Sequence, residues 1–106
     1  MRPEPRVSLE ARADIFESAV YYDEQRPNLG YEFMDEVEYA ILRIRENPEQ
    51  FPVVMDPGRR VLLRRFPYGI FYITGEEDEV IVAVVDLRRD PSTWKRRISQ
   101  FQPADY

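Results

Sequence analysis

Arginine side chains gather at two places in the second half of the chain. The members are Arg59, Arg60, Arg64 and Arg65 in the first group, and Arg88, Arg89, Arg96 and Arg97 in the second. A guanidinium binds phosphate or carboxylate through two parallel hydrogen bonds, so a surface that collected these groups would engage nucleic acid or an acidic partner. Two alternatives remain: each arginine pairs with an acid of its own chain, or a GC-rich genome has enriched arginine.

Acid–base and metal chemistry has few candidate residues, because the chain contains neither histidine nor cysteine. Their absence removes the commonest general base, thiolate ligands and disulfides. Asp86 remains as a candidate base, but Arg88 and Arg89 follow it, so we expect a lowered pKa and a structural Asp–Arg pair. Other acids are expected to be solvated flanks of helices: Asp14, Glu17, Glu32, Asp35 and Glu36. We therefore predict no metal site and no cofactor.

Trp94 lies between the arginines of the second group. An exposed tryptophan beside cations can stack on a nucleobase. It can equally close the end of a sheet as a core aromatic residue, which is the interpretation we favour.

Three strands are predicted to carry these residues, at 59–66, 68–74 and 79–87, with a turn at 75–78. Residues 80–85 are apolar at every position. This run is typical of a strand that is buried on both faces. The two arginine groups would then lie at the ends of a β-hairpin, and residues 91–97 would form a short helix at most.

Two helices are predicted in the first half, after a short edge strand at 6–8. Ser8 is a suitable N-cap. An apolar stripe recurs at helical spacing, made of Leu9, Ala13, Phe16 and Val20 and widened by Ile15, Ala19 and Tyr22. Asn28 can cap the second helix, whose apolar face runs from Phe33 to Ile44. Asn47-Pro48 ends it, because the residue before a proline avoids helical backbone angles. The two helices should form an antiparallel hairpin, followed by a loop at 49–58.

Length and charge limit the remaining possibilities. The 106 residues suit a single domain over 1–106, with a core at about 6–97 and a tail at 98–106. We expect a cytoplasmic protein without membrane contact, because no apolar run approaches a membrane span or a signal peptide. The first 58 residues carry 13 acidic and 6 basic groups, whereas residues 59–97 carry 9 basic and 6 acidic groups. The predicted helices are therefore acidic and the predicted sheet is basic.

An ordered series of short motifs extends over residues 6–97. Its members are Tyr22, the segment Gln25-Arg26-Pro27-Asn28-Leu29-Gly30, Phe33, Asn47-Pro48, Phe51-Pro52, Arg64-Arg65-Phe66-Pro67-Tyr68 and the stretch from Asp86 to Arg97. In order and spacing the series resembles the RelE/ParE superfamily, the toxins of type II toxin–antitoxin modules, also called plasmid stabilisation proteins. The resemblance implies an α+β fold: an antiparallel helical hairpin packed on a twisted, mostly antiparallel sheet, in the order β-α-α-β-β-β.

The resemblance also implies a function. The protein would be a growth inhibitor that a cognate antitoxin neutralises, and it would contact DNA only through that antitoxin. The resemblance places antitoxin or target binding on the basic sheet surface and Trp94. The residues concerned are Arg59, Arg60, Arg64, Arg65, Arg88, Arg89 and Trp94.

Two mechanisms occur in the superfamily: ParE-like members poison DNA gyrase, and RelE-like members cleave messenger RNA on the ribosome. Of the positions that the RNA-cleaving branch uses, only Arg60 and Arg88 are matched, and these are the candidate catalytic residues. Leu62, Gly69 and Trp94 replace a cation, an arginine and a tyrosine, and Asp86 stands where many members have histidine. A sequence pI near 4.8 also argues against ribosomal RNA as a target. We favour gyrase; enzymatic activity remains open, as does a decayed, inactive toxin.

Overall fold

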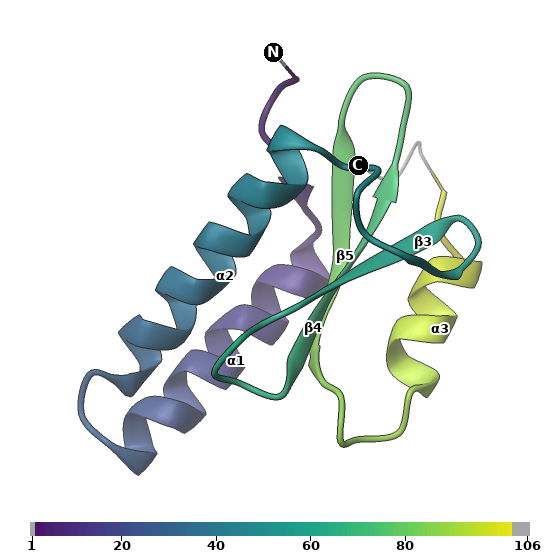
Figure 1. Ribbon diagram of the computed structural model, residues 1–106. Coiled ribbons are helices and arrows are strands. Elements are labelled where there is room, and N and C mark those ends of the chain that lie inside the picture. The colour runs from purple at the N-terminus through teal and green to yellow at the C-terminus, as the bar shows by residue number, and fades with distance from the viewer. Residues whose placement is uncertain (1, 103–106) are drawn as a thin grey trace.

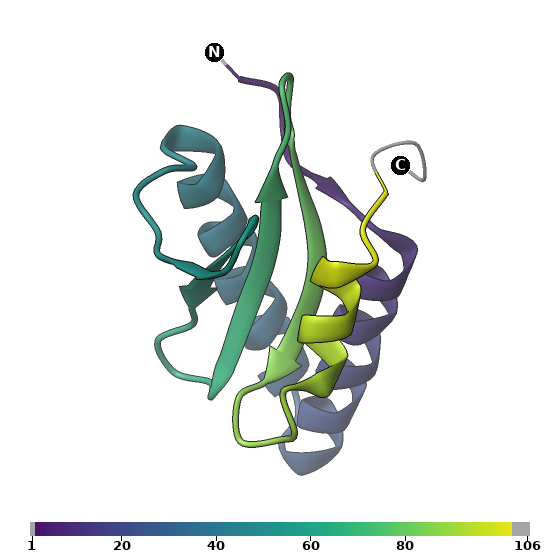
Figure 2. The ribbon, with the colours of Figure 1, turned by 90° about the vertical axis from the view of Figure 1, so that its right-hand side faces the viewer.

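A computed structural model describes residues 2–102 of the chain. The layers are a hairpin of two helices, a sheet, and a third helix on the other face of the sheet (Figures 1 and 2). This arrangement confirms the predicted α+β fold, with the helical hairpin on one face of a mostly antiparallel sheet.

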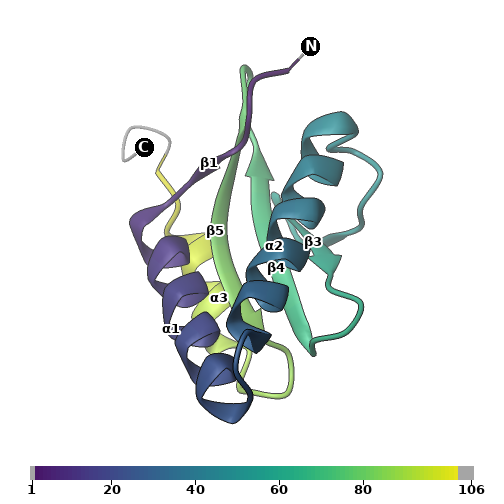
Figure 3. The same ribbon diagram turned by 90° about the vertical axis from the view of Figure 1, so that its left-hand side faces the viewer.

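The hairpin consists of α1 (Leu9–Gln25) and α2 (Leu29–Glu46), which lie side by side in Figure 3. Ser8 caps α1 as predicted, because its buried hydroxyl accepts a hydrogen bond from the Ala11 N–H at 3.1 Å. Asn28 precedes α2 with left-handed backbone angles, but its side chain makes no capping bond. The capping oxygen belongs instead to Asp23 of α1, which accepts from the Gly30 N–H at 3.1 Å. The bond ties the end of α1 to the start of α2.

The sheet has the strand order β1-β5-β4-β3-β2. Its strands are β1 (Arg6–Val7), β2 (Val53–Met55), β3 (Gly58–Leu62), β4 (Tyr68–Thr74) and β5 (Glu79–Asp86). Only the pair β1–β5 is parallel. The predicted turn closes β4 and β5 through a bond from the Gly75 N–H to the Asp78 carbonyl at 2.8 Å.

Two predicted boundaries are wrong. The segment expected to be a loop at 49–58 contains β2, which pairs with β3. The strand expected to reach residue 66 ends at Leu62. Beyond it, the N–H groups of Arg64 and Arg65 donate to the Glu36 carboxylate of α2, at 2.5 and 2.8 Å, rather than to a neighbouring strand.

The core has a part on each face of the sheet. Phe33, Ile44 and Tyr72 belong to the part under the helical hairpin. Phe71 and Ile98 belong to the part under α3 (Ser92–Ser99). The run at 80–85 is therefore covered on both faces, as predicted. Because Ile98 is buried, the core continues beyond residue 97; residues 103–106 of the expected tail lie outside the described part of the chain.

The apolar stripe predicted for α1 is wrong in part. Leu9, Ala13, Phe16 and Val20 are exposed, whereas Ile15, Ala19 and Tyr22 face the core as predicted. Small residues lie where α1 and α2 approach each other closely. A Cβ on Gly30 of α2 would lie 2.4 Å from the Ala19 carbonyl oxygen, so only glycine fits at that position. On α2 the predicted face is confirmed. In residues 2–102, no helix has both the length and the hydropathy that crossing a bilayer requires.

Candidate functional site

The structure distributes the arginines over several surroundings rather than over one continuous surface. Arg59 of β3 donates from Nη1 to the carbonyls of Glu49 and Phe51, at 3.1 and 2.6 Å. It therefore fastens the segment between α2 and β2 to the sheet. Arg96 is exposed on α3.

Arg64 and Arg65 lie beside α2, where the chain turns between β3 and β4. The Arg65 guanidinium donates to Glu36 from Nε at 3.1 Å and to Glu32 from Nη1 at 2.9 Å. These bonds lower the pKa of Glu32 and raise that of Arg65. The Arg64 guanidinium lies 5.8 Å from the centroid of the Tyr39 ring. Both arginines therefore contact the helical hairpin.

Arg88 binds Asp86 through two hydrogen bonds, from Nε at 3.1 Å and from Nη2 at 2.8 Å. The ion pair confirms the structural interpretation of Asp86. The Arg88 side chain is the main cause of a lowered pKa of Asp86, so the carboxylate is a poor proton acceptor at neutral pH. Nearby, burial raises the pKa of Tyr22 to about 12, with a further contribution from Tyr68.

Arg88 and Arg89 line a cleft of about 560 Å³ between α1, the end of β5 and the segment leading to α3. Arg97 of α3 forms part of its wall. The Arg97 guanidinium binds the Asp14 carboxylate of α1 at 2.6 and 3.1 Å and the Val82 carbonyl at 3.0 Å. Asp14 also accepts from the Val84 N–H at 2.9 Å. These bonds join three elements at the cleft.

Asp14 and Glu36 are not the solvated acids that the sequence suggests. Their side chains are 14% and 13% exposed, because each is closed by an arginine from a distant part of the chain. No local pattern could identify them, since Asp14 and Arg97 are 83 residues apart. Among residues 2–102, no cluster of three or more acidic, histidine or cysteine side chains could hold a metal ion.

Arg60 of β3 lies on the face of the sheet that carries α3. It pairs in register with Phe71, whose ring stacks on Trp94 at 4.4 Å between centroids and an angle of 13°. The stacking packs the partly buried Trp94 ring against the core residue Phe71. A Cβ on Gly69 would lie 3.1 Å from the Arg60 Cδ, so the absence of a side chain at Gly69 leaves space for the Arg60 side chain. The Nε of Arg60 is buried and has no hydrogen-bond partner within residues 2–102.

The two matched family positions, Arg60 and Arg88, do not share a site. Arg60 lies on the α3 face, as its partner Phe71 does. Asp86, which holds Arg88, pairs in register with Tyr68, and Tyr68 packs against Phe33 of α2 on the hairpin face. The sheet therefore separates the two guanidinium groups.

Comparison with known proteins finds similarity among solved structures. No protein-family model matches the sequence, and no match is found among curated proteins. Among solved structures, the fold matches a chain of "Chromosomal ParDE TA system from P. aeruginosa" with a TM-score of 0.68 and 13% sequence identity. The match covers 78% of this chain and 96% of that chain. It shows a shared fold, the one that the resemblance to the RelE/ParE superfamily implies.

Proposed function

We propose that the protein is the toxin of a type II toxin–antitoxin module, a growth inhibitor that acts in the cytoplasm until a cognate antitoxin binds it. One observation carries the proposal: the chain has the fold of a chain from a ParDE system along nearly the whole length of that chain. The ordered series of family motifs, found from residues alone, supports the same assignment.

We further propose that the toxin acts by binding DNA gyrase, as ParE-like members do, and not by cutting RNA. The surroundings of Arg60 support this, because its neighbours on the α3 face are Gly69, Phe71 and Trp94. Such a site suits binding of an anionic group beside an apolar surface. Proton transfer needs a group whose pKa lies near the working pH, whereas the pKa of Asp86 is lowered by Arg88.

Within this proposal Arg60 is the first contact for an acidic group of the target. Its Nε lacks a partner within residues 2–102. This Nε is itself buried, so an acidic group of the target would bind the accessible part of the half-buried Arg60 side chain, where a hydrogen bond to a partly desolvated cation gains affinity. Arg88, Arg89 and the cleft beside α3 form a separate surface, which we assign to the antitoxin.

Induced expression in bacteria tests the proposal. The expected result is growth arrest, induction of the DNA-damage response, and messenger RNA that stays intact on primer-extension gels. Expression of the neighbouring antitoxin reading frame should restore growth. Ribosome-dependent cleavage of messenger RNA at codon-defined positions would contradict gyrase binding and support the RelE-like mechanism. Normal growth with folded protein present would indicate a decayed toxin.

A further inference from the structure

The outer face of the helical hairpin is apolar and uncovered. Eight of the ten exposed large hydrophobic side chains in residues 2–102 lie on α1 and α2. They include Phe16, which is 59% exposed, and Tyr31, which is 68% exposed. Four of the eight, Phe16, Val20, Tyr31 and Met34, lie around one groove, and an exposed apolar patch of this kind on a small protein marks an interaction surface.

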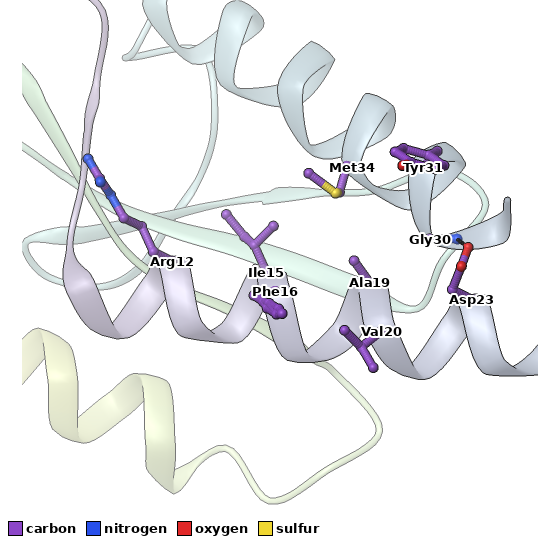
Figure 4. A pocket seen from close by; sticks show the side chains of 9 residues that line it. All are labelled: Arg12, Ile15, Phe16, Ala19, Val20, Asp23, Gly30, Tyr31 and Met34. Carbon is purple, nitrogen blue, oxygen red and sulfur yellow. Dashed lines mark hydrogen bonds between the residues drawn. The ribbon is translucent and has the colours of Figure 1, made fainter.

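The patch contains a groove between the two helices, shown in Figure 4. Its volume is about 470 Å³, and Ala19 and Gly30 form its narrow floor. Phe16 and Val20 of α1 and Met34 of α2 border it. A large side chain from another helix would find space above Ala19.

The groove carries one charge of each sign. Arg12 lies at one end and Asp23 at the other (Figure 4). The Nε of Arg12 donates to the Val7 carbonyl at 3.2 Å, and Asp23 accepts from the Gly30 N–H. No ion pair joins either side chain to a charged residue within 2–102. An incoming helix with charges of one sign would meet a like charge at one end, which disfavours a uniformly acidic or basic partner.

We propose that the occupant of this groove is a second copy of the chain, related by a two-fold axis, with α1 packed antiparallel against the α1 of its partner. Two-fold contacts use the same patch on both subunits, so the patch must be complementary to itself. In an antiparallel pair that crosses between Glu17 and Ser18, residues at equal distances from the crossing meet. Arg12 then faces Asp23 of the other copy, and the contact occurs twice.

The same register matches the shapes of the two surfaces. Phe16 comes to lie over Ala19 of the other copy, which places a large exposed ring over a small buried residue. Glu17, the acid next to the crossing, lines the cleft beside α3 and does not enter the groove. A parallel pair would instead place Arg12 against Arg12, so the charges select the antiparallel arrangement.

Sedimentation equilibrium of the purified full-length chain tests the proposal without any target or antitoxin, so its outcome is independent of the proposed function. The monomer has a mass of 12.7 kDa. We expect the apparent mass to rise to twice this value as the protein concentration increases from about 1 to 500 µM, which corresponds to a dimer dissociation constant within that range. A monomer over the whole range would overturn the proposal and leave the groove to a different protein.

Matched variants locate the contact. Val20→Glu should raise the dimer dissociation constant at least about tenfold, because it places two buried carboxylates at the interface. Val53→Glu is the control, since Val53 of β2 is 48% exposed against 46% for Val20 but lies off the patch. Equal effects of the two variants, with circular dichroism unchanged, would refute the assigned face.

Substitutions that change the charge of Asp23 or Arg12 test the contacts proposed at the two ends of the groove. Asp23→Asn removes the charge but keeps the oxygen that accepts from the Gly30 N–H, so the hairpin stays capped. It should weaken the dimer several-fold, and Arg12→Glu should weaken it further, because each glutamate then faces Asp23. Dimers unaffected by Arg12→Glu would contradict the antiparallel register.

Discussion

Arg60 is the residue at which the sequence resemblance and the local geometry agree. Arg60→Ala should reduce growth inhibition about tenfold or more, since a hydrogen bond to a charged group contributes about 1.5–3 kcal/mol. Arg60→Lys should restore activity only in part, because an ammonium lacks the planar fork of a guanidinium. Arg26→Ala is the control: Arg26 is exposed at the end of α1 and forms an ion pair with Glu32. The measurement is the inducer dose that halves growth, with thermal unfolding to verify the fold. Full activity of the folded Arg60→Ala protein would place target binding elsewhere.

The Asp86–Arg88 pair gives a pH dependence with a definite sign. Because the pair lowers the pKa of Asp86, folded protein releases this proton at a lower pH than unfolded chain does. The stabilisation is present at neutral pH, above the ordinary pKa, and is lost as the pH falls through the lowered value. A carboxyl NMR titration should give an Asp86 midpoint below the ordinary value of about 3.9. Arg88→Ala should move it upward, and an unchanged midpoint would show that the ion pair does not form in solution.

At the scale of the elements, Asp14 is the link that holds α3 to α1 and β5. Asp14→Ala should destabilise the fold by about 1–3 kcal/mol, because it removes the acceptor of the Arg97 guanidinium and of the Val84 N–H, while Glu10 stays 3.6 Å from the Arg97 Nε. Glu17→Ala removes an exposed acid one turn away and serves as the control. Denaturant unfolding gives the free energies, and hydrogen exchange should show the α3 amides opening first. Equal stability of the two variants would mean that packing of Ile98 and Trp94 positions α3 without the Asp14 contacts.

The elements themselves were largely predictable from the sequence, because capping, proline and periodicity are local signals. Ser8, Asn47-Pro48 and the run at 80–85 fixed their elements correctly. The orientation of α1 was predictable only in part, since two of its core-facing residues are alanines while Leu9, Phe16 and Val20 are exposed. The end of β3 was also missed, because Glu36, 28 residues earlier in the chain, binds the N–H of Arg64.

At the scale of the whole molecule, the candidate site was predictable by residue type but not by arrangement. The sequence places acids on the helices and arginines on the sheet. In the structure some of these opposite charges bind each other, because Arg65 and Arg97 pair with carboxylates of α2 and α1. The number of arginines therefore overstates the charge available to a partner. Which arginines can contact a partner protein depends on their positions in the fold, and clustering in the sequence does not define those positions.

Co-expression with the neighbouring reading frame should yield a complex in which an antitoxin segment folds across the sheet and the cleft beside α3. Acidic residues of that segment should pair with Arg88 and Arg89. Arg89→Glu should weaken the complex more than Arg26→Glu, as measured by calorimetry on purified proteins. Recovery of this protein alone in the presence of its folded neighbour would contradict the proposed module.

Supercoiling of relaxed plasmid by purified DNA gyrase tests the proposed binding of gyrase. The protein should inhibit supercoiling and accumulate cleaved plasmid at concentrations near those of the enzyme, and the purified antitoxin should reverse both effects. Arg60→Ala should require about tenfold more protein for the same inhibition, by the hydrogen-bond contribution given above. Undiminished supercoiling at a large excess of folded protein would contradict the account.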